Sequence, residues 1–280
     1  MRVEIIFDEP IIFTGVDGQP THAPMVAATV LGEATRLIVD TGSTDHILTK
    51  ELADRVGLRA DPGEEGIDAS GASVASWTLG DVPVQIGETT HRLANVIAIG
   101  APGPFEPRGI GGVISPQHLV PDAWVRVDMA QDRFMALSGL ETDVAGWLAD
   151  RAPGFQLYRL ARDEADSTIL VRGAIEPFDD VSTLLDTGGK ASDVVASAVP
   201  GLSGDEVASS GRGVGGNESF GAVALDQVLR VGEVRLPVPR LVVRDEIEGR
   251  GILVGMDLLR GTIVTVTGDP ALPVFWQVPA

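Results

Sequence analysis

The tripeptide Asp-Thr-Gly occurs twice in the 280-residue chain, once in each half. One copy begins at Asp40 after the run "LIV", and the other begins at Asp186 after the run "TLL". A single Asp-Thr-Gly is typical of an ordinary turn, since Asp and Gly are common turn residues. Two such turns, each at the end of a strand-like apolar run, indicate that the two halves repeat one unit.

Other segments recur in the same order and at similar distances from each Asp-Thr-Gly. "DASGAS" and "VQIGE" in the first half correspond to "ASSGRG" and "LRVGE" in the second. "GGVISPQHL" likewise corresponds to "RGILVGMDL", and a pair of strand-like segments follows each. The stretch between the halves has no counterpart. We therefore predict one unit over residues 1–137, a connection over 138–160 and a second unit over 161–280.

The apolar residues are arranged in the way that is typical of β-strands. Most apolar runs are four to eight residues long, rich in Val, Ile and Thr, and bounded by Gly, Pro or Asp. Helical periodicity is confined to short pieces near residues 48–57 and 146–151. With 44% hydrophobic residues, the chain can build a packed core. The pattern predicts an all-β protein.

Composition argues against several classes of function. The formal net charge of −19 argues against binding to nucleic acid, whose phosphates it would repel. The same charge is typical of a solvated acidic surface, although it could also favour basic substrates. The chain has no cysteine, and its four histidines are too scattered for a metal site, so no metal or cofactor is expected.

The sequence also predicts where the chain works. No apolar run approaches the roughly 18 residues of a membrane helix. The N-terminal residues lack the basic start and long apolar middle of a signal peptide. We expect a cytoplasmic protein without a membrane partner, with a trimmed secreted or periplasmic form as the alternative.

The repeated motifs resemble those of the aspartic proteases. The resemblance lies in "IVDTGST", "LLDTGGK" and "GILVGMDLLRGTIVTV". The two-lobed plan is similar to that of the pepsin-like enzymes, whereas each half is closer in length and landmarks to a retropepsin unit. The resemblance implies two retropepsin-like units fused in one chain. It also implies two related β-lobes with a central cleft, one or two β-hairpin flaps, and a monomer.

The resemblance assigns Asp40 and Asp186 to a catalytic pair. Two carboxylates in contact cannot both ionise cheaply and therefore share a proton, an effect for which aspartic proteases are the standard example. Such a pair activates water to attack a peptide bond without a covalent intermediate. Because the two titrations are coupled, neither residue is assigned as the acid or the base.

Other motif positions receive supporting roles by the same resemblance. Thr41 and Thr187 should link the two loops, and Gly42 and Gly188 should let backbone amides approach the carboxylates. The hydroxyl of Ser43 should bond to the first carboxylate.

The second loop departs from the family pattern. Gly189 lacks the hydroxyl that Ser43 has, and Lys190 follows where a small residue is more usual. Lys190 is either a solvated side chain or a cation that lowers the proton affinity of the pair.

Two glycine-rich segments are candidates for flaps that close over a substrate. Trp77, which follows the first of them, either replaces the flap tyrosine of the pepsin-like enzymes or belongs to the core. An ordinary flexible hairpin remains the alternative reading for the second segment. The residues predicted to contact substrate are Ser70, Gly71, Ala72 and Ser73 in the first segment and Gly211, Arg212 and Gly213 in the second.

These observations predict an endopeptidase that hydrolyses an extended peptide or protein substrate. Its specificity is either broad or limited to one partner, as in a processing protease. The alternative is a peptide-binding protein of the same fold with weak or no catalysis, which the departures at Gly189 and Lys190 suggest.

Overall fold

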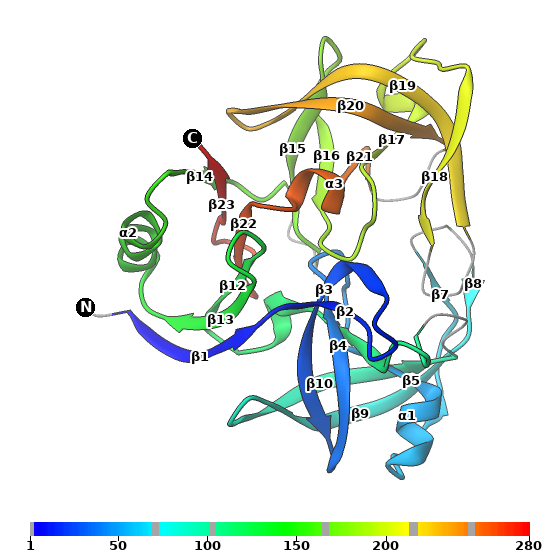
Figure 1. Ribbon diagram of the computed structural model, residues 1–280, viewed down its shortest axis with the longest axis vertical. Coiled ribbons are helices and arrows are strands. Elements are labelled where there is room, and N and C mark those ends of the chain that lie inside the picture. The colour runs from blue at the N-terminus through cyan, green and yellow to red at the C-terminus, as the bar shows by residue number, and fades with distance from the viewer. Residues whose placement is uncertain (1–2, 69–72, 101–104, 164–167, 213–217, 246–249) are drawn as a thin grey trace.

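The computed structural model describes residues 3–68, 73–100, 105–163, 168–212, 218–245 and 250–280. The fold is all-β, as the apolar pattern predicts, and three larger sheets carry most of it. In Figure 1 the sheet built from the C-terminal half of the chain lies above the sheet built from the N-terminal half. The third sheet, which contains both ends of the chain, lies to their left. The described residues form three short α-helices, which are α1 (Lys50–Arg55), α2 (Glu141–Arg151) and α3 (Met256–Leu259).

The first sheet is built from the N-terminal half of the chain. Its eight strands lie in the order β2-β3-β4-β11-β5-β10-β9-β6. In that order they are β2 (Ile12–Thr14), β3 (Pro20–Val30), β4 (Glu33–Val39), β11 (Ile110–Ile114), β5 (Ile47–Thr49), β10 (Thr89–Ile99), β9 (Ser76–Ile86) and β6 (Asp61–Pro62). A separate two-stranded sheet pairs β7 (Gly66–Ile67) with β8 (Ser73–Val74).

The second sheet is built from the C-terminal half. Its seven strands lie in the order β15-β16-β21-β17-β20-β19-β18. In that order they are β15 (Leu170–Ile175), β16 (Val181–Leu185), β21 (Ile252–Val254), β17 (Asp193–Val195), β20 (Val234–Arg244), β19 (Glu218–Val231) and β18 (Glu206–Arg212).

The two sheets have the same topology apart from the extra edge strand β2. In the first, β11 pairs parallel with β4 and antiparallel with β5. In the second, β21 pairs parallel with β16 and antiparallel with β17. The antiparallel pairing of β3 with β9 likewise corresponds to that of β15 with β19. Strands that follow each Asp-Thr-Gly therefore occupy matching places in the two sheets.

The third sheet joins the two ends of the chain to its middle. Its order is β1-β13-β12-β22-β23-β14. In that order the strands are β1 (Glu4–Pro10), β13 (Arg133–Ser138), β12 (Trp124–Asp128), β22 (Ile263–Thr267), β23 (Val274–Pro279) and β14 (Phe155–Leu160). The segment 138–160 thus contributes α2 and β14. The helix packs Val144 and Leu148 against Trp124 and Phe275 of this sheet.

One hydrophobic cluster runs through both halves. Leu37 and Val39 of β4, Leu185 of β16 and Trp276 of β23 all belong to it, and none exposes measurable surface. Burying side chains of this size contributes about 1.5–3 kcal/mol each. Because strands from distant parts of the chain share this core, the ends of β4 and β16 are held in a fixed relation.

Candidate active site

The two Asp-Thr-Gly turns begin at matching strand ends. Asp40 follows β4, and its amide donates to the carbonyl of Ile114 in the parallel neighbour β11 at 3.0 Å. Asp186 follows β16, and its amide donates to the carbonyl of Val254 in β21, also at 3.0 Å. The parallel pairings end there, so each aspartate lies just beyond a fixed sheet edge.

The structure brings the two carboxylates together. A hydrogen bond joins the side chains of Asp40 and Asp186. Gly42 lies against the Asp186 carboxyl group, and a Cβ atom at Gly42 would be 2.8 Å from Asp186 Oδ1. Gly188 lies against the Asp40 carboxyl group in the same way. A side chain at either glycine would push the carboxylates apart.

The environment favours the protonated form of Asp40. Burial is the largest cause, the neighbouring Asp186 carboxylate is the second, and together they raise the pKa of Asp40 well above its usual range. Asp186 is only 6% exposed, whereas Asp40 keeps part of its surface accessible. The pair can therefore hold one proton while it remains in reach of a ligand.

Thr41 and Thr187 link the two loops reciprocally. The Thr41 hydroxyl donates to the carbonyl of Leu185 at 2.6 Å, and the Thr187 hydroxyl donates to the carbonyl of Val39 at 2.7 Å. Each hydroxyl also accepts the backbone amide of the other threonine, at 3.0 and 3.1 Å. Both side chains are fully buried. These four bonds cross from one half of the chain to the other and set the separation of the two aspartates.

Backbone amides donate to both carboxylates, and those of Gly42 and Gly188 both support Asp40. Gly42 N donates to Asp40 Oδ1 at 2.8 Å. Asp186 Oδ1 accepts two amides, from Gly188 and Gly189, each at 2.8 Å. The second carboxylate is therefore supported by the backbone at the position where the sequence lacks a hydroxyl.

Residues 26–113 match a family model described as aspartyl protease. The matched segment runs from β3 into β11 and contains the first Asp-Thr-Gly. This region is similar to aspartyl proteases. The match supports a protease, and hence a peptide substrate, for the chain. No curated protein matches the chain.

One expected contact within this protease-like site differs from the prediction. The Ser43 hydroxyl donates to the carbonyl of Asp45 at 2.7 Å rather than to the Asp40 carboxylate. A serine hydroxyl readily bonds to a backbone group two residues away, and this local bond competes with the predicted one. The first carboxylate therefore relies on the amides of Gly42 and Gly188 and on its partner Asp186.

Two residues that connect the loops to the central strands by hydrogen bonds, His46 and Ser192, were not predicted from the sequence. His46 and Ser192 each lie six positions after the aspartate of an Asp-Thr-Gly motif, and each accepts a backbone amide from the end of a central strand. Ser115 N donates to His46 Nδ1 at 3.3 Å, and Gly255 N donates to Ser192 Oγ at 3.0 Å. The equal spacing from Asp40 and Asp186 was the only signal in the sequence that could have revealed this correspondence.

The residues that follow Gly255 and Ser115 differ in whether they can donate a backbone hydrogen bond. Met256 N donates to the carbonyl of Gly189 at 2.9 Å. The matching residue of the first half, Pro116, has no backbone N–H. The side chain of Gln117 supplies the donor instead, reaching the carbonyl of Ser43 at 2.9 Å. Each loop thus accepts a hydrogen bond at the matching carbonyl group, that of Ser43 in the first loop and that of Gly189 in the second.

His46 is neutral in this setting. Its side chain is 2% exposed, and burial lowers its pKa to about 4. Because Nδ1 accepts the Ser115 amide, Nε2 carries the proton and donates to the carbonyl of His118 at 3.2 Å. Protonation of Nδ1 would remove the first of these bonds.

The predicted flap residues lie partly outside the described residues. Ser70, Gly71, Ala72 and Gly213 are among those not described. Ser73 begins β8, is exposed, and donates through its hydroxyl to Glu65 at 2.8 Å. Gly211 and Arg212 end β18, which pairs with β19 in a hairpin. The flanks of both candidates are therefore β-structure.

The remaining candidates are placed as follows. Trp77 lies in β9, half-buried, with the Lys50 ammonium group 5.6 Å from its ring centre. Lys190 is exposed. A cavity of about 1060 Å³ lies on the far side of the first loop, next to Thr44, Asp45 and His46, and neither Asp40 nor Asp186 lines it.

Two further classes of feature can be assessed in the described part of the chain. There, no three His, Asp or Glu side chains are grouped so that they could hold a metal ion. The helices of these same residues are all too short or too polar to cross a membrane.

Proposed function

We propose that this protein is an aspartic endopeptidase whose two retropepsin-like units, residues 1–137 and 161–280, are fused through residues 138–160. The observation that carries the proposal is the hydrogen-bonded pair of Asp40 and Asp186, one from each half. The matching order of strands in the two sheets supports the descent of both halves from one unit. Since one chain supplies both aspartates, we expect a monomer.

The proposed reaction is hydrolysis by an activated water molecule. The ionised carboxylate of the pair takes a proton from the water, which attacks the peptide carbonyl carbon. The protonated carboxyl group donates a hydrogen bond to the carbonyl oxygen as charge develops on it. A proton then passes to the leaving nitrogen. The raised pKa of Asp40 supports a pair that shares one proton.

The substrate would be a peptide bound in extended form. An extended backbone can pair with strand edges such as those of the β7–β8 and β18–β19 hairpins, while pockets select its side chains. We propose that these hairpins act as the flaps. A processing protease with few substrates is the narrower form of this proposal.

An inactive peptide-binding protein is less well supported. Two departures motivated it, Gly189 and Lys190, and the first is offset because the amide of Gly189 donates to Asp186. The second carboxylate therefore keeps its support without a hydroxyl.

Cleavage of a mixed peptide library between pH 3 and 8 tests the proposal. We expect the wild-type protein to cut, and Asp40→Asn and Asp186→Asn each to lose at least about a thousandfold in rate, because either change removes half of the acid–base pair. Asp45→Asn is the matched control, since this nearby carboxylate lies outside the pair, and it should retain activity. Undiminished cleavage by either dyad variant would refute the assignment.

A further inference from the structure

Three basic side chains gather beside the second Asp-Thr-Gly, on one side of the catalytic pair. They are His22, Arg108 and Lys190. His22 belongs to β3 of the first sheet, but its Nε2 donates to the carbonyl of Gly188 at 3.1 Å. It thus extends from the first half of the chain to the catalytic loop of the second.

His22 is exposed to solvent beside the Asp186 loop. Surrounding protein nevertheless desolvates its side chain enough to lower its pKa. A ligand bound next to the Asp186 loop would therefore contact this imidazole.

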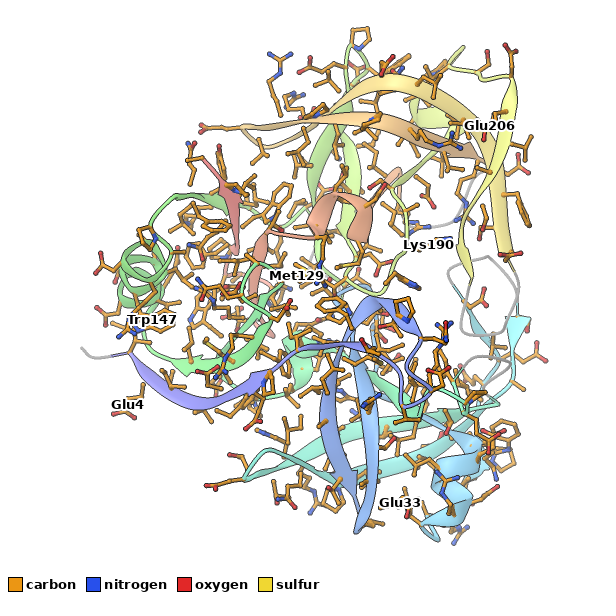
Figure 2. The ribbon with its side chains drawn as sticks, in the orientation of Figure 1. Glu4, Glu33, Met129, Trp147, Lys190 and Glu206 are labelled. Atoms are coloured by element: carbon orange, nitrogen blue, oxygen red, sulfur yellow. The ribbon has the colours of Figure 1, made fainter. Side chains whose placement is uncertain are left out.

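Lys190 follows the same loop and remains open to solvent. In Figure 2 it lies between the upper and lower sheets, near the lower end of β18. A Cβ atom at Gly211 of that strand would be 3.7 Å from the Cβ of Lys190. The lysine is therefore placed between the catalytic loop and one of the proposed flaps.

Arg108 completes the group from the first half. Its side chain packs on Gly15, and its carbonyl accepts the amide of Val16 at 3.0 Å, in the turn that leads into β3. The charges of Arg108 and Lys190 both act on His22. Arg108 and Lys190 thus both lie within electrostatic reach of His22.

This concentration of positive charge is unusual for the chain. The protein has a net charge of −19 and only two lysines, Lys50 and Lys190. Most basic side chains pair with a carboxylate, but neither Arg108 nor Lys190 does so within the described residues. Cations without a partner beside a peptide site are suited to an anionic ligand group.

The positive charge of Lys190 has no counterpart at the matching position of the first loop. The residue of the first loop that matches Lys190 is Thr44, and an acid, Asp45, follows it. Thr44 donates its hydroxyl to the Asp45 carboxylate at 2.7 Å. A peptide lying across both loops would meet the Lys190 cation near Asp186 and an uncharged residue, Thr44, at the matching position near Asp40.

We infer that His22, Arg108 and Lys190 form a cationic subsite that binds a carboxylate of the substrate peptide on the Asp186 side of the scissile bond. This inference rests on the proposed function for its substrate class. The carboxylate belongs either to a Glu or Asp side chain or to the C-terminus of the peptide.

Binding to the Asp40→Asn variant tests the subsite without relying on cleavage. The probes are blocked decapeptides that carry Glu, Gln or Lys at one position, scanned along the peptide, and measured by fluorescence anisotropy. At one position we expect Glu to bind about tenfold more tightly than Gln, as for one charge-assisted contact. A parallel set with a free C-terminal carboxylate distinguishes a terminal group from a side chain.

Further substitutions in the same Asp40→Asn background identify the residues responsible. Lys190→Thr, which copies Thr44, should abolish most of the Glu preference, and Lys190→Glu should reverse it in favour of Lys. His22→Gln, which keeps a side-chain N–H for Gly188, and Arg108→Gln should each weaken it. Lys50→Thr makes the same change at the other lysine and should leave the preference intact.

The outcomes separate this inference from the proposed function. Equal binding of Glu and Gln peptides at every position would overturn the subsite, as would an unchanged preference in Lys190→Thr. Equal loss of affinity for all three peptides would show that Lys190 acts only on structure and would also overturn it. A Glu preference in a protein that cuts nothing would refute the endopeptidase and leave the subsite standing.

Discussion

At the scale of single residues, close packing decides which side chains the two Asp-Thr-Gly loops accept. Gly42 and Gly188 each lie against the aspartate of the other loop, so their lack of a Cβ lets the two carboxylates meet. Gly189 is constrained in the same way. A Cβ there would lie 2.8 Å from Asp186 Oδ2 and 3.0 Å from Leu253 Cδ2. The absence of a hydroxyl at this position is therefore a requirement of this loop.

Gly189→Ala tests that requirement. We expect cleavage to fall at least about tenfold, because the new methyl group displaces the Asp186 carboxylate, and we expect unfolding free energy to fall by about 1–3 kcal/mol from overpacking. Peptide cleavage and thermal unfolding measure the two effects. Gly100→Ala, the same change at a glycine with no neighbour within 4 Å, is the control. Full activity of Gly189→Ala would contradict the predicted collision.

At the scale of structural elements, the two Asp-Thr-Gly loops are held in place by hydrogen bonds from different sets of polar groups. The first loop depends on His46 and Gln117, and the second depends on Ser192 and Asp257. Ser192 donates its hydroxyl to Asp257 at 2.7 Å while it accepts the amide of Gly255. Only the first loop has an imidazole in this place.

The buried imidazole makes the first half sensitive to acid. Because the pKa of His46 is about 4 in the folded protein and 6.5 in the unfolded chain, the unfolded chain takes up the proton first as pH falls. Stability should decrease from pH 6.5 to 4 and then level off, by up to about 3 kcal/mol in total.

Denaturant unfolding of His46→Gln at pH 7 and pH 4 checks this expectation. The variant should lose most of the difference in unfolding free energy that the wild type shows between these pH values. His118→Gln removes the neighbouring imidazole and keeps His46, so it should retain most of the difference. If His46→Gln keeps the full wild-type difference, the acid sensitivity lies elsewhere.

At the scale of the whole molecule, the pair of Asp40 and Asp186 lies where the two halves meet and opposes their association. Burial and the second carboxylate raise the pKa of Asp40, so the folded protein keeps a proton that the unfolded chain releases. Stability is therefore lost as pH rises from about 3.8 through the folded-state pKa. The shared core and the four threonine bonds offset this cost.

Asp40→Asn should therefore stabilise the protein while it abolishes cleavage. Asparagine cannot ionise, so we expect its melting temperature at pH 7 to exceed that of the wild type by at least about 2 °C, a shift that corresponds to roughly 1 kcal/mol or less in a chain of this size. The gain should disappear near pH 3.5, where both states of the wild type are protonated. Melting curves of the wild type, Asp40→Asn and the control Asp45→Asn from pH 3.5 to 7 measure it. An unchanged or lower melting temperature at pH 7 would contradict the predicted cost.

The sequence by itself determined the strand-rich fold and the two aspartates that meet. Short apolar runs of β-branched residues and a motif repeated at similar spacing are local signals, and local signals can be read without coordinates. Only the tertiary structure showed the sheet shared by both ends of the chain, the Ser43 bond to Asp45, and the positions of His22 and His46. These depend on contacts between residues far apart in the chain, such as His22 with Gly188, and no local pattern encodes such a distance.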